Sequence, residues 1–294
     1  MSDIHYVIQE RTARIGKSIV GRLLPFRAKR MIGPFIYMDH MGPELFDEDE
    51  NFDVGPHPHI GLSTLTYLLE GSILHRDTLG NAIEIKPGEV NWMTAGKGIV
   101  HSERTPDYLR NQKKKMHGLQ IWIALPKELE QMEAAFFHAG KESLPHWNIG
   151  DISFKLIAGE AFGRKSPVPV YSKLFFIEVK SQTNQTLSIA NELFGETGIY
   201  ILDGSIEAED KIFETGQLVV SKDSKLSEII ITAGSTVFLL GGEPFPEERF
   251  IDWNFVSSSR ALLEEARQRW IAQEFGQLPG ENDFIPLPGL KPEN

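Results

Sequence analysis

Two pairs of side chains with metal-ligating chemistry stand at i, i+2 spacing in this sequence. The first pair is His57 and His59 in GPHPHIG, where a proline precedes each histidine and biases the backbone toward an extended conformation. The second pair is His101 and Glu103 in GIVHSER. Side chains alternate between the two faces of an extended strand, so the members of each pair point the same way. If the two strands face each other inside one barrel, three imidazoles and one carboxylate converge.

The donor types limit the chemistry of such a site. The chain has no cysteine, which excludes thiolate ligands and disulfides and leaves nitrogen and oxygen donors. Three imidazoles and a carboxylate suit Fe, Mn, Co, Ni, Cu or Zn, and they disfavour a hard cation bound by oxygen alone. Four protein ligands leave one or two positions open on a six-coordinate metal, where substrate or oxygen can bind. An isolated His-x-His is more often a surface pair, so the matching His-x-Glu carries the metal prediction.

Other residues near these pairs are open to two interpretations. His75, in LHRD, is either a structural histidine held by a hydrogen bond or a residue that supports the metal ligands. His40 and His117 lie beside apolar runs and are expected to be core or rim residues. A set of large side chains at strand spacing is expected to pack a barrel, although some of them could line a pocket: Trp92, Met93 and Trp122.

Short strands must position these pairs. Runs such as FIYMD, LTYLLEG, LQIWIALP and STVFLLGG are rich in β-branched and aromatic residues, and Gly, Pro, Asn and Asp separate them. Many short strands with turn signals between them predict an all-β sandwich or barrel.

Two segments interrupt this strand pattern and are predicted as helices. The first covers residues 126–138 and begins with a proline near its first turn. The second covers residues 257–276 and carries an apolar stripe at i, i+4, i+8 formed by Leu262, Ala266 and Trp270. The proline-rich segment that follows Gly276 is expected to lie extended over the surface.

An internal repeat divides the chain. Residues 67–103 align by eye with residues 200–244 through an apolar pair, an acid, Gly-Ser-Ile, and a later Thr-Ala-Gly before a final apolar strand. The first copy contains the candidate ligands, whereas no histidine follows His146. We therefore predict two β-barrel domains. Residues 1–137 form a metal-binding barrel, and residues 138–294 form a barrel without metal ligands that also carries the helix and the extended tail.

Composition limits the classes of partner and compartment. The formal net charge of −11 argues against nucleic acid as a direct partner, because phosphate binding needs a positive surface. No apolar run is long enough to span a bilayer, so no membrane partner is expected. The first residues lack the apolar core of a signal peptide, which indicates a cytoplasmic protein. We expect this protein to be a monomer.

Several segments closely resemble the pirin family, a bicupin group of the cupin superfamily: PHPHIGLSTLTYLLEG, HRDTLGN, PGEVNWMTAGKGIVHSE and LQIWI. PFIYMDHMGP, WNFVSSS and FIPLP are also similar to pirin segments, so the resemblance extends from about residue 10 to the tail. It implies an all-β bicupin, with two jelly-roll barrels (double-stranded β-helices) and a C-terminal helix. Carried over residue by residue, the family's iron ligands correspond to His57, His59, His101 and Glu103.

The chain departs from the general cupin pattern at one place. Cupins generally place a glutamate three or four residues after the His-x-His, where this sequence has Ser63 and Thr64. Pirins resemble this chain in taking the carboxylate from the second motif instead.

The resemblance implies two kinds of function. Some bacterial pirins cleave the flavonol quercetin with molecular oxygen and release carbon monoxide, and others are iron-dependent regulators that bind partner proteins. Our leading hypothesis is a mononuclear Fe(II) quercetin 2,3-dioxygenase-type enzyme that acts on a flavonol-like aromatic and O2, with Glu103 as catalytic base. Nickel, cobalt, manganese, copper or zinc could replace iron during purification.

Two alternatives stay open at this point. One is a metal-dependent, redox-sensitive regulatory protein that acts through a protein partner. The other, a cupin isomerase of sugar phosphates, is weaker because it needs a basic phosphate cradle. Near the predicted metal, the sequence offers only Arg76, Lys97 and Arg104 for that purpose.

Overall fold

Strands dominate the structure, a computed structural model that describes residues 3–15, 18–221 and 226–289. Within these residues the strands form an eight-stranded, a seven-stranded and two four-stranded sheets, together with one two-stranded hairpin. A single α-helix, α1 (Arg260–Ile271), occurs in the described part of the chain and follows the last strand. This confirms the predicted all-β fold with a C-terminal helix. No described helix is long and apolar enough to cross a membrane.

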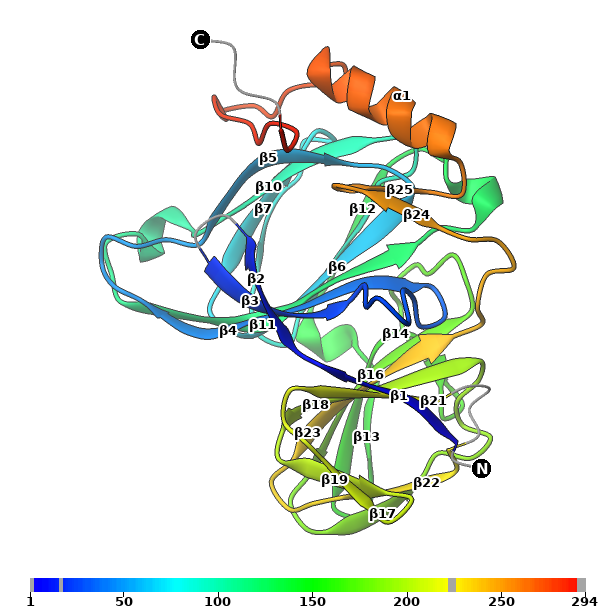
Figure 1. The fold of residues 1–294 in the computed structure, drawn as a ribbon. Helices are drawn as coiled ribbons and strands as arrows, with labels where there is room; N and C mark the ends of the chain where they lie inside the picture. The colour runs from blue at the N-terminus through cyan, green and yellow to red at the C-terminus, as the bar shows by residue number, and fades with distance from the viewer. Residues whose placement is uncertain (1–2, 16–17, 222–225, 290–294) are drawn as a thin grey trace. The chain divides into compact units, whose positions relative to one another are not determined.

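The first barrel consists of two sheets that face each other (Figure 1). One sheet has the order β5-β10-β7-β8, and the other has the order β12-β9-β6-β11-β4-β3-β2. The strands of this barrel are β2 (Arg11–Ile15), β3 (Ser18–Leu24), β4 (Phe35–Phe46), β5 (Asp53–His59), β6 (Leu62–Glu70), β7 (Ile73–Asp77), β8 (Ala82–Ile85), β9 (Val90–Thr94), β10 (Ile99–Arg104), β11 (Lys114–Ala124) and β12 (Ala135–Ala139). Two short 3-10 helices, η1 (Asp107–Leu109) and η2 (Lys127–Leu129), lie in its connections.

The second barrel repeats this arrangement. Its sheets have the orders β17-β22-β19-β20 and β1-β21-β18-β23-β16-β14-β13, with β15 paired to β14. The strands are β1 (Ile4–Gln9), β13 (His146–Ile149), β14 (Ile152–Ala161), β15 (Arg164–Lys165), β16 (Leu174–Ser181), β17 (Gln185–Ser188), β18 (Glu196–Asp203), β19 (Ser205–Ala208), β20 (Lys211–Glu214), β21 (Gln217–Ser221), β22 (Glu228–Ile231) and β23 (Thr236–Gly242), and η3 (Lys141–Ser143) precedes β13. The strand orders of the two four-stranded sheets correspond one to one, as the internal repeat predicts.

The two compact units of the structure are not contiguous in sequence. The unit that contains most of the first barrel consists of Ala13–Val20, His40–His138 and Pro246–Asn294. The unit that contains the second barrel consists of Met1–Thr12, Gly21–Asp39 and Ala139–Phe245. At the ends of the chain, β1 pairs with β21, whereas the buried side chains of α1 share an apolar cluster with Ile60 and Val100. The division into domains at residues 1–137 and 138–294 stays a prediction.

The segment predicted as a helix at residues 126–138 is not one. It contains the short turn η2 and then the strand β12, which pairs with β9. The stretch AFFHA places Phe136 against His75, with ring centroids 4.6 Å apart. Pairing with a sheet edge and aromatic packing therefore outweigh the weak helical preference of this segment.

Helix α1 lies inside the predicted range 257–276, but its buried stripe differs by one residue. Leu262 is only half-buried, because the observed stripe at i, i+3, i+7 covers a narrower arc of the helix. The buried residues are Leu263, Ala266 and Trp270. Residues 277–289 have no regular secondary structure, although Leu278 and Leu287 are buried with the helix.

A glycine allows the C-terminal hairpin to approach β5. The hairpin consists of β24 (Phe250–Asp252) and β25 (Phe255–Ser257), and the amide of Val256 donates to the carbonyl of Ile60 at 3.2 Å. Gly61 has a φ of +66°, and a Cβ at this position would lie 1.9 Å from the carbonyl oxygen of Val256. Only glycine fits such a contact, so the hairpin is fixed directly beside His59.

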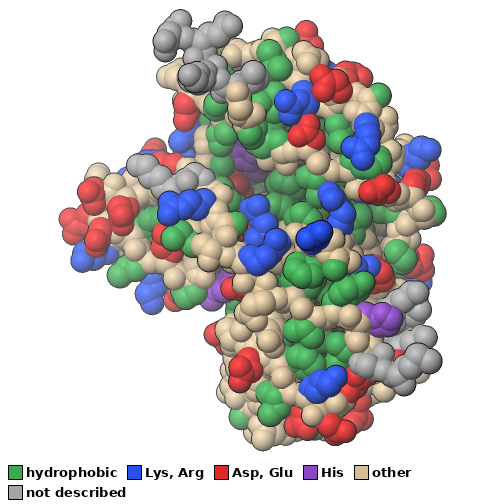
Figure 2. Space-filling model, in the orientation of Figure 1, with side chains coloured by type: hydrophobic (Ala, Val, Ile, Leu, Met, Phe, Trp, Pro, Cys, Tyr) green, Lys and Arg blue, Asp and Glu red, His purple; other side chains and the backbone are tan. Residues whose placement is uncertain are grey.

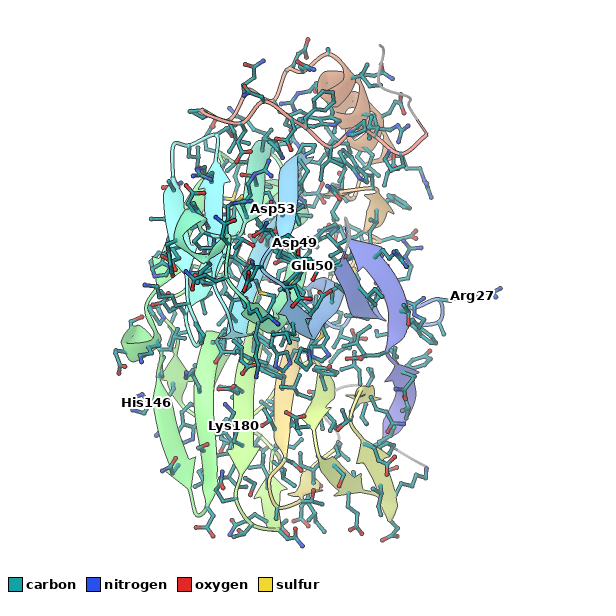
Figure 3. The ribbon with its side chains drawn as sticks, turned by 90° about the vertical axis from the view of Figure 1, so that its left-hand side faces the viewer. Arg27, Asp49, Glu50, Asp53, His146 and Lys180 are labelled. Atoms are coloured by element: carbon teal, nitrogen blue, oxygen red, sulfur yellow. The ribbon has the colours of Figure 1, made fainter. Side chains whose placement is uncertain are left out.

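The connection between β4 and β5 carries an acidic surface. Figure 2 shows acidic side chains gathered there, and Figure 3 shows Asp49, Glu50 and Asp53 close to one another. Together with Phe46 and Phe52 they line a cavity of about 420 Å³. A negative surface of this kind repels phosphates.

Candidate metal centre

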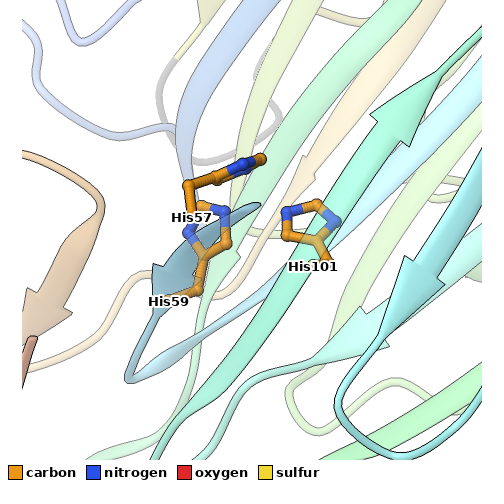
Figure 4. Close-up of side chains that lie close together, drawn as sticks. All are labelled: His57, His59 and His101. Carbon is orange, nitrogen blue, oxygen red and sulfur yellow. The ribbon is translucent and has the colours of Figure 1, made fainter. Parts of the chain in front are cut away.

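Strands β5 and β10 bring three histidines together inside the first barrel (Figure 4). The two strands are antiparallel, and His57 is opposite His101 in their register. One ring nitrogen from each of His57, His59 and His101 lies within 4.8 Å of the others. The three side chains are 7%, 1% and 1% exposed, respectively. The two predicted strand motifs therefore converge at one buried site.

Hydrogen bonds orient two of these rings. The Nδ1–H of His57 donates to the carbonyl oxygen of Gly55 at 2.8 Å, and that of His59 donates to the carbonyl oxygen of Asn254 at 3.1 Å. In this tautomer the Nε2 atom of each ring keeps a lone pair for a ligand. Second hydrogen bonds of this type fix the orientation of histidine ligands in metal sites.

The third ring is oriented by a chain of two polar side chains. His75 Nε2 donates to Asp77 Oδ2 at 3.0 Å, so Nδ1 of His75 can accept a hydrogen bond from Nδ1–H of His101, 3.4 Å away. Within the described part of the chain, the buried Nε2 of His101 has no hydrogen-bond partner. A buried nitrogen without a partner is costly unless it binds something. His75, for which the sequence left two interpretations open, therefore supports His101.

Burial keeps the three imidazoles neutral. It lowers the pKa of His57 to about 4, and it lowers the pKa values of His59 and His101 well below their ordinary value, with a further contribution from neighbouring histidines. A neutral imidazole has the lone pair that a metal needs. Three neutral nitrogen donors, including the unpartnered Nε2 of His101, fit a divalent transition metal.

Glu103 is close to this site but lies outside the three-histidine group. The pairing of β10 with β5 shifts by one residue between His101 and Glu103, a bulge that places Glu103 opposite Val54. Its buried carboxylate accepts a hydrogen bond from Thr66 Oγ1 at 3.3 Å. Burial raises the pKa of Glu103, although His75 and the hydrogen bond from Thr66 oppose the shift.

Of the three large side chains expected to pack the barrel or line a pocket, one contacts the histidines. Trp122 packs edge-on against His59, with centroids 5.1 Å apart, whereas Trp92 and Met93 are buried in the barrel wall. No sequence pattern indicated Asn254, because it contributes a backbone carbonyl. Phe136, which stacks on His75, was hidden inside the segment predicted as a helix.

The remaining histidines of the first barrel lie apart from this group. His40 and His117 face each other, with their Nε2 atoms 2.9 Å apart, and neither belongs to the three-histidine group. His138 accepts or donates a hydrogen bond at Nδ1 to Asn91 Oδ1, 2.8 Å away. In the second barrel, His146 lies exposed on β13 (Figure 3).

Comparison with known proteins identifies a consistent set of relatives. The family model described as "Pirin" matches residues 17–123, and that of the "Pirin C-terminal cupin domain" matches residues 176–276. A "Pirin-like protein" of Caulobacter vibrioides is 46% identical over 290 residues, which cover 97% of this chain and 99% of the relative.

Solved structures give the same grouping. The crystal structure of a quercetin 2,3-dioxygenase from Acinetobacter baumannii is 35% identical, with a TM-score of 0.89 and coverage of 98% of this chain and 96% of that one. The bacterial pirin YhhW from Escherichia coli, solved in complex with nickel(II), is 19% identical with a TM-score of 0.64, over 82% and 99% of the two chains. At that identity, YhhW supports the fold alone.

Proposed function

Because this chain belongs to the pirin family of bicupins, we propose that it is a mononuclear Fe(II) dioxygenase that opens a flavonol-like ring with O2. The observation that carries the proposal is the buried group of His57, His59 and His101, whose rings are neutral and oriented. The dioxygenase from Acinetobacter baumannii, similar over almost the whole chain, supports this reaction class.

We propose that Glu103 completes the ligand set with a carboxylate oxygen. It stands two residues from His101 on the same strand, and its side chain is only 7% exposed. Bound iron would supply a Lewis acid for the substrate oxygens and a redox centre for oxygen. Nitrogen and carboxylate donors do not select iron over nickel, cobalt, manganese, copper or zinc, so availability decides which metal is found after purification.

The proton chemistry then belongs to Glu103. A flavonol must lose the proton of its hydroxyl group before the ring reacts, and Glu103 is a buried carboxylate two residues from His101 on β10. A carboxylate at this place can accept that proton directly. His57, His59 and His101 hold the metal and do not transfer this proton, because a coordinated imidazole nitrogen has no lone pair left.

The aromatic surroundings would exclude water from the reacting ring. Trp122 lies against His59, and Phe136 lies against His75 on another side. Apolar walls of this kind strengthen the electrostatic interactions inside the site and suppress side reactions with water.

The test is oxygen uptake after anaerobic reconstitution with Fe(II), measured with a panel of flavonols. Glu103→Gln should weaken metal binding about 10-fold or more. It should also lower turnover at matched iron occupancy by roughly 10²–10⁴, the typical value of general base catalysis. Glu178→Gln is the matched control, because Glu178 is an equally buried carboxylate of the second barrel.

Two results would contradict the proposal. Equal oxygen consumption by the wild type and Glu103→Gln would remove Glu103 as the base. An iron-loaded wild type that consumes no oxygen with any flavonol would favour the regulatory protein, whose partner binding should depend on metal content alone.

A further inference from the structure

The C-terminal tail crosses the outside of the two strands that carry the histidines. In Figure 1 the red segment that follows α1 lies beside β5. The amide of Ile285 donates to the carbonyl oxygen of Pro56 at 2.8 Å, and Trp270 Nε1 donates to the carbonyl oxygen of Ile285 at 3.1 Å. The tail is thereby fixed to the strand residue that precedes His57.

One carboxylate of this tail binds both neighbours of Glu103. Glu281 Oε1 accepts a hydrogen bond from Ser102 Oγ at 2.8 Å, and Glu281 Oε2 accepts one from Arg104 Nε at 2.8 Å. The Glu281 side chain is only 7% exposed. Arg76, on β7 beside His75, lies 3.8 Å from the same carboxylate.

Strand geometry makes this contact a link to the metal centre. Side chains alternate along β10, so His101 and Glu103 point into the barrel while Ser102 and Arg104 point out toward the tail. Holding the two outward residues fixes the backbone between them. The positions and orientations of Glu103 and His101 then depend on Glu281, which is 179 residues from Ser102 and 177 residues from Arg104 in sequence.

These polar contacts lie beside a cavity. A cavity of about 270 Å³ lies between the tail and the two strands, and its lining includes Pro56, Val100, Trp270, Glu281 and Phe284. Asp283 adds a hydrogen bond from Arg104 Nη2 at 2.7 Å, but its side chain is 61% exposed. Exposed pairs contribute little, so the buried carboxylate of Glu281 contributes more to the contact with Arg104 than Asp283 does.

We propose that Glu281 is a positioning residue of the metal centre, which holds Ser102 and Arg104 from outside the barrel and so sets the placement of His101 and Glu103. This inference rests on the proposed function, since it requires a metal at the three histidines. Residues that orient metal ligands without touching the metal typically contribute 10- to 100-fold to affinity.

The experiment measures Co(II) binding, alone and without substrate, by competition with a chelator and by the visible absorption of bound cobalt. Glu281→Ala should weaken binding about 10- to 100-fold and change the absorption bands, because the ligands lose their fixed geometry. Glu281→Asp keeps the charge with a shorter reach and should recover part of the affinity. Glu281→Gln keeps the shape and tests the charge if the alanine variant does not fold.

Glu196→Gln is the matched control. Glu196 is a mostly buried carboxylate of the second barrel that pairs with Lys29 and accepts the amide of Gly33 at 2.9 Å. The Glu196→Gln substitution should lower thermal stability without changing the affinity for cobalt or the absorption of bound cobalt. If the wild type binds cobalt and the Glu281 variants have the same affinity and the same absorption bands, the role of Glu281 is wrong while the proposed metal centre stands. A wild type that binds no cobalt would overturn the proposed metal centre first.

Discussion

The two barrels share one strand order and differ in what fills them. In the second barrel, β16, β18 and β23 contribute a continuous apolar interior that includes Phe175, Ile177, Ile199, Ile201 and Leu239, all at most 1% exposed. The corresponding sheets of the first barrel enclose three histidines, a glutamate and the His75–Asp77 pair. The comparison teaches that the scaffold does not need polar residues at these positions, which supports the proposed metal site in the first barrel.

The difference can be followed residue by residue. When the two Gly-Ser-Ile motifs are aligned, His75 of β7 corresponds to Ala208 of β19. Glu103 lies opposite His75, and extending the register of β19 and β22 places Ile229 opposite Ala208. Equivalent positions therefore carry a buried polar pair in one barrel and an apolar pair in the other.

The polar interior is accompanied by additional apolar packing outside the first barrel. α1 and the tail bury Leu263, Trp270, Phe275 and Leu278 in one cluster with Val100, which neighbours His101. Burial of large apolar side chains stabilises by about 1.5–3 kcal/mol each. This packing offsets the cost of placing polar groups where the second barrel has its core.

The largest expected effect comes from the core of the second barrel. Leu239→Ala removes a fully buried side chain from β23 and should lower the free energy of unfolding by about 2–5 kcal/mol. Metal affinity should not change, because the ligands belong to the other compact unit. Urea denaturation and metal titration measure the two quantities; a parallel loss of metal affinity would show that the barrels are not independent in this respect.

Lowering the pH should reduce the stability of the first barrel. The unfolded chain protonates His57 near pH 6.5, whereas the folded, metal-free chain does so only near pH 4, so stability falls as pH decreases between these values. His57 alone should cost about 2 kcal/mol between pH 6.5 and 5, at 1.36 kcal/mol per pH unit. His59 and His101 act in the same direction, and the raised pKa of Glu103 opposes them.

Urea unfolding of the metal-free chain at pH 7 and pH 5 measures this loss. Replacement of all three histidines by phenylalanine should remove most of it. If that variant and the wild type lose the same stability, the acid sensitivity originates elsewhere.

A smaller effect, on metal affinity, is expected from substitution of His75, whose equivalent in the second barrel is an alanine. His75→Ala introduces the residue type of the second barrel and removes the support of His101, so metal affinity should fall by 10- to 100-fold. His40→Ala is the control, because His40 lies outside the group. Isothermal titration with Ni(II) distinguishes the two, and an affinity of His75→Ala equal to that of the control would make His75 a purely structural residue.

Much of this organisation could be predicted from the sequence, because it depends on local periodicity. The i, i+2 spacing of His57 with His59 predicted two ligands on one face, and the Gly-Ser-Ile repeat predicted two barrels of one design. The bulge between His101 and Glu103 could not be predicted, because it depends on the register with β5. Asn254 and Glu281 were also missed, since they reach the site from the far end of the chain.

The place of helix α1 in the fold could not be predicted for the same reason. Helix α1 follows the second barrel in sequence, yet its apolar stripe packs with residues of the first. Periodicity identifies an apolar face but does not say which surface covers it.

Metal content per chain tests the central claim most directly. Wild type, His101→Ala and His146→Ala are loaded with Fe(II) anaerobically, desalted and measured by elemental analysis. We predict about one metal per chain for the wild type and for His146→Ala, and almost none for His101→Ala with the fold retained. Among the described residues, the one group that could hold a metal lies in the first barrel. Two tightly bound metals in the wild type, or one metal retained by His101→Ala, would contradict this account.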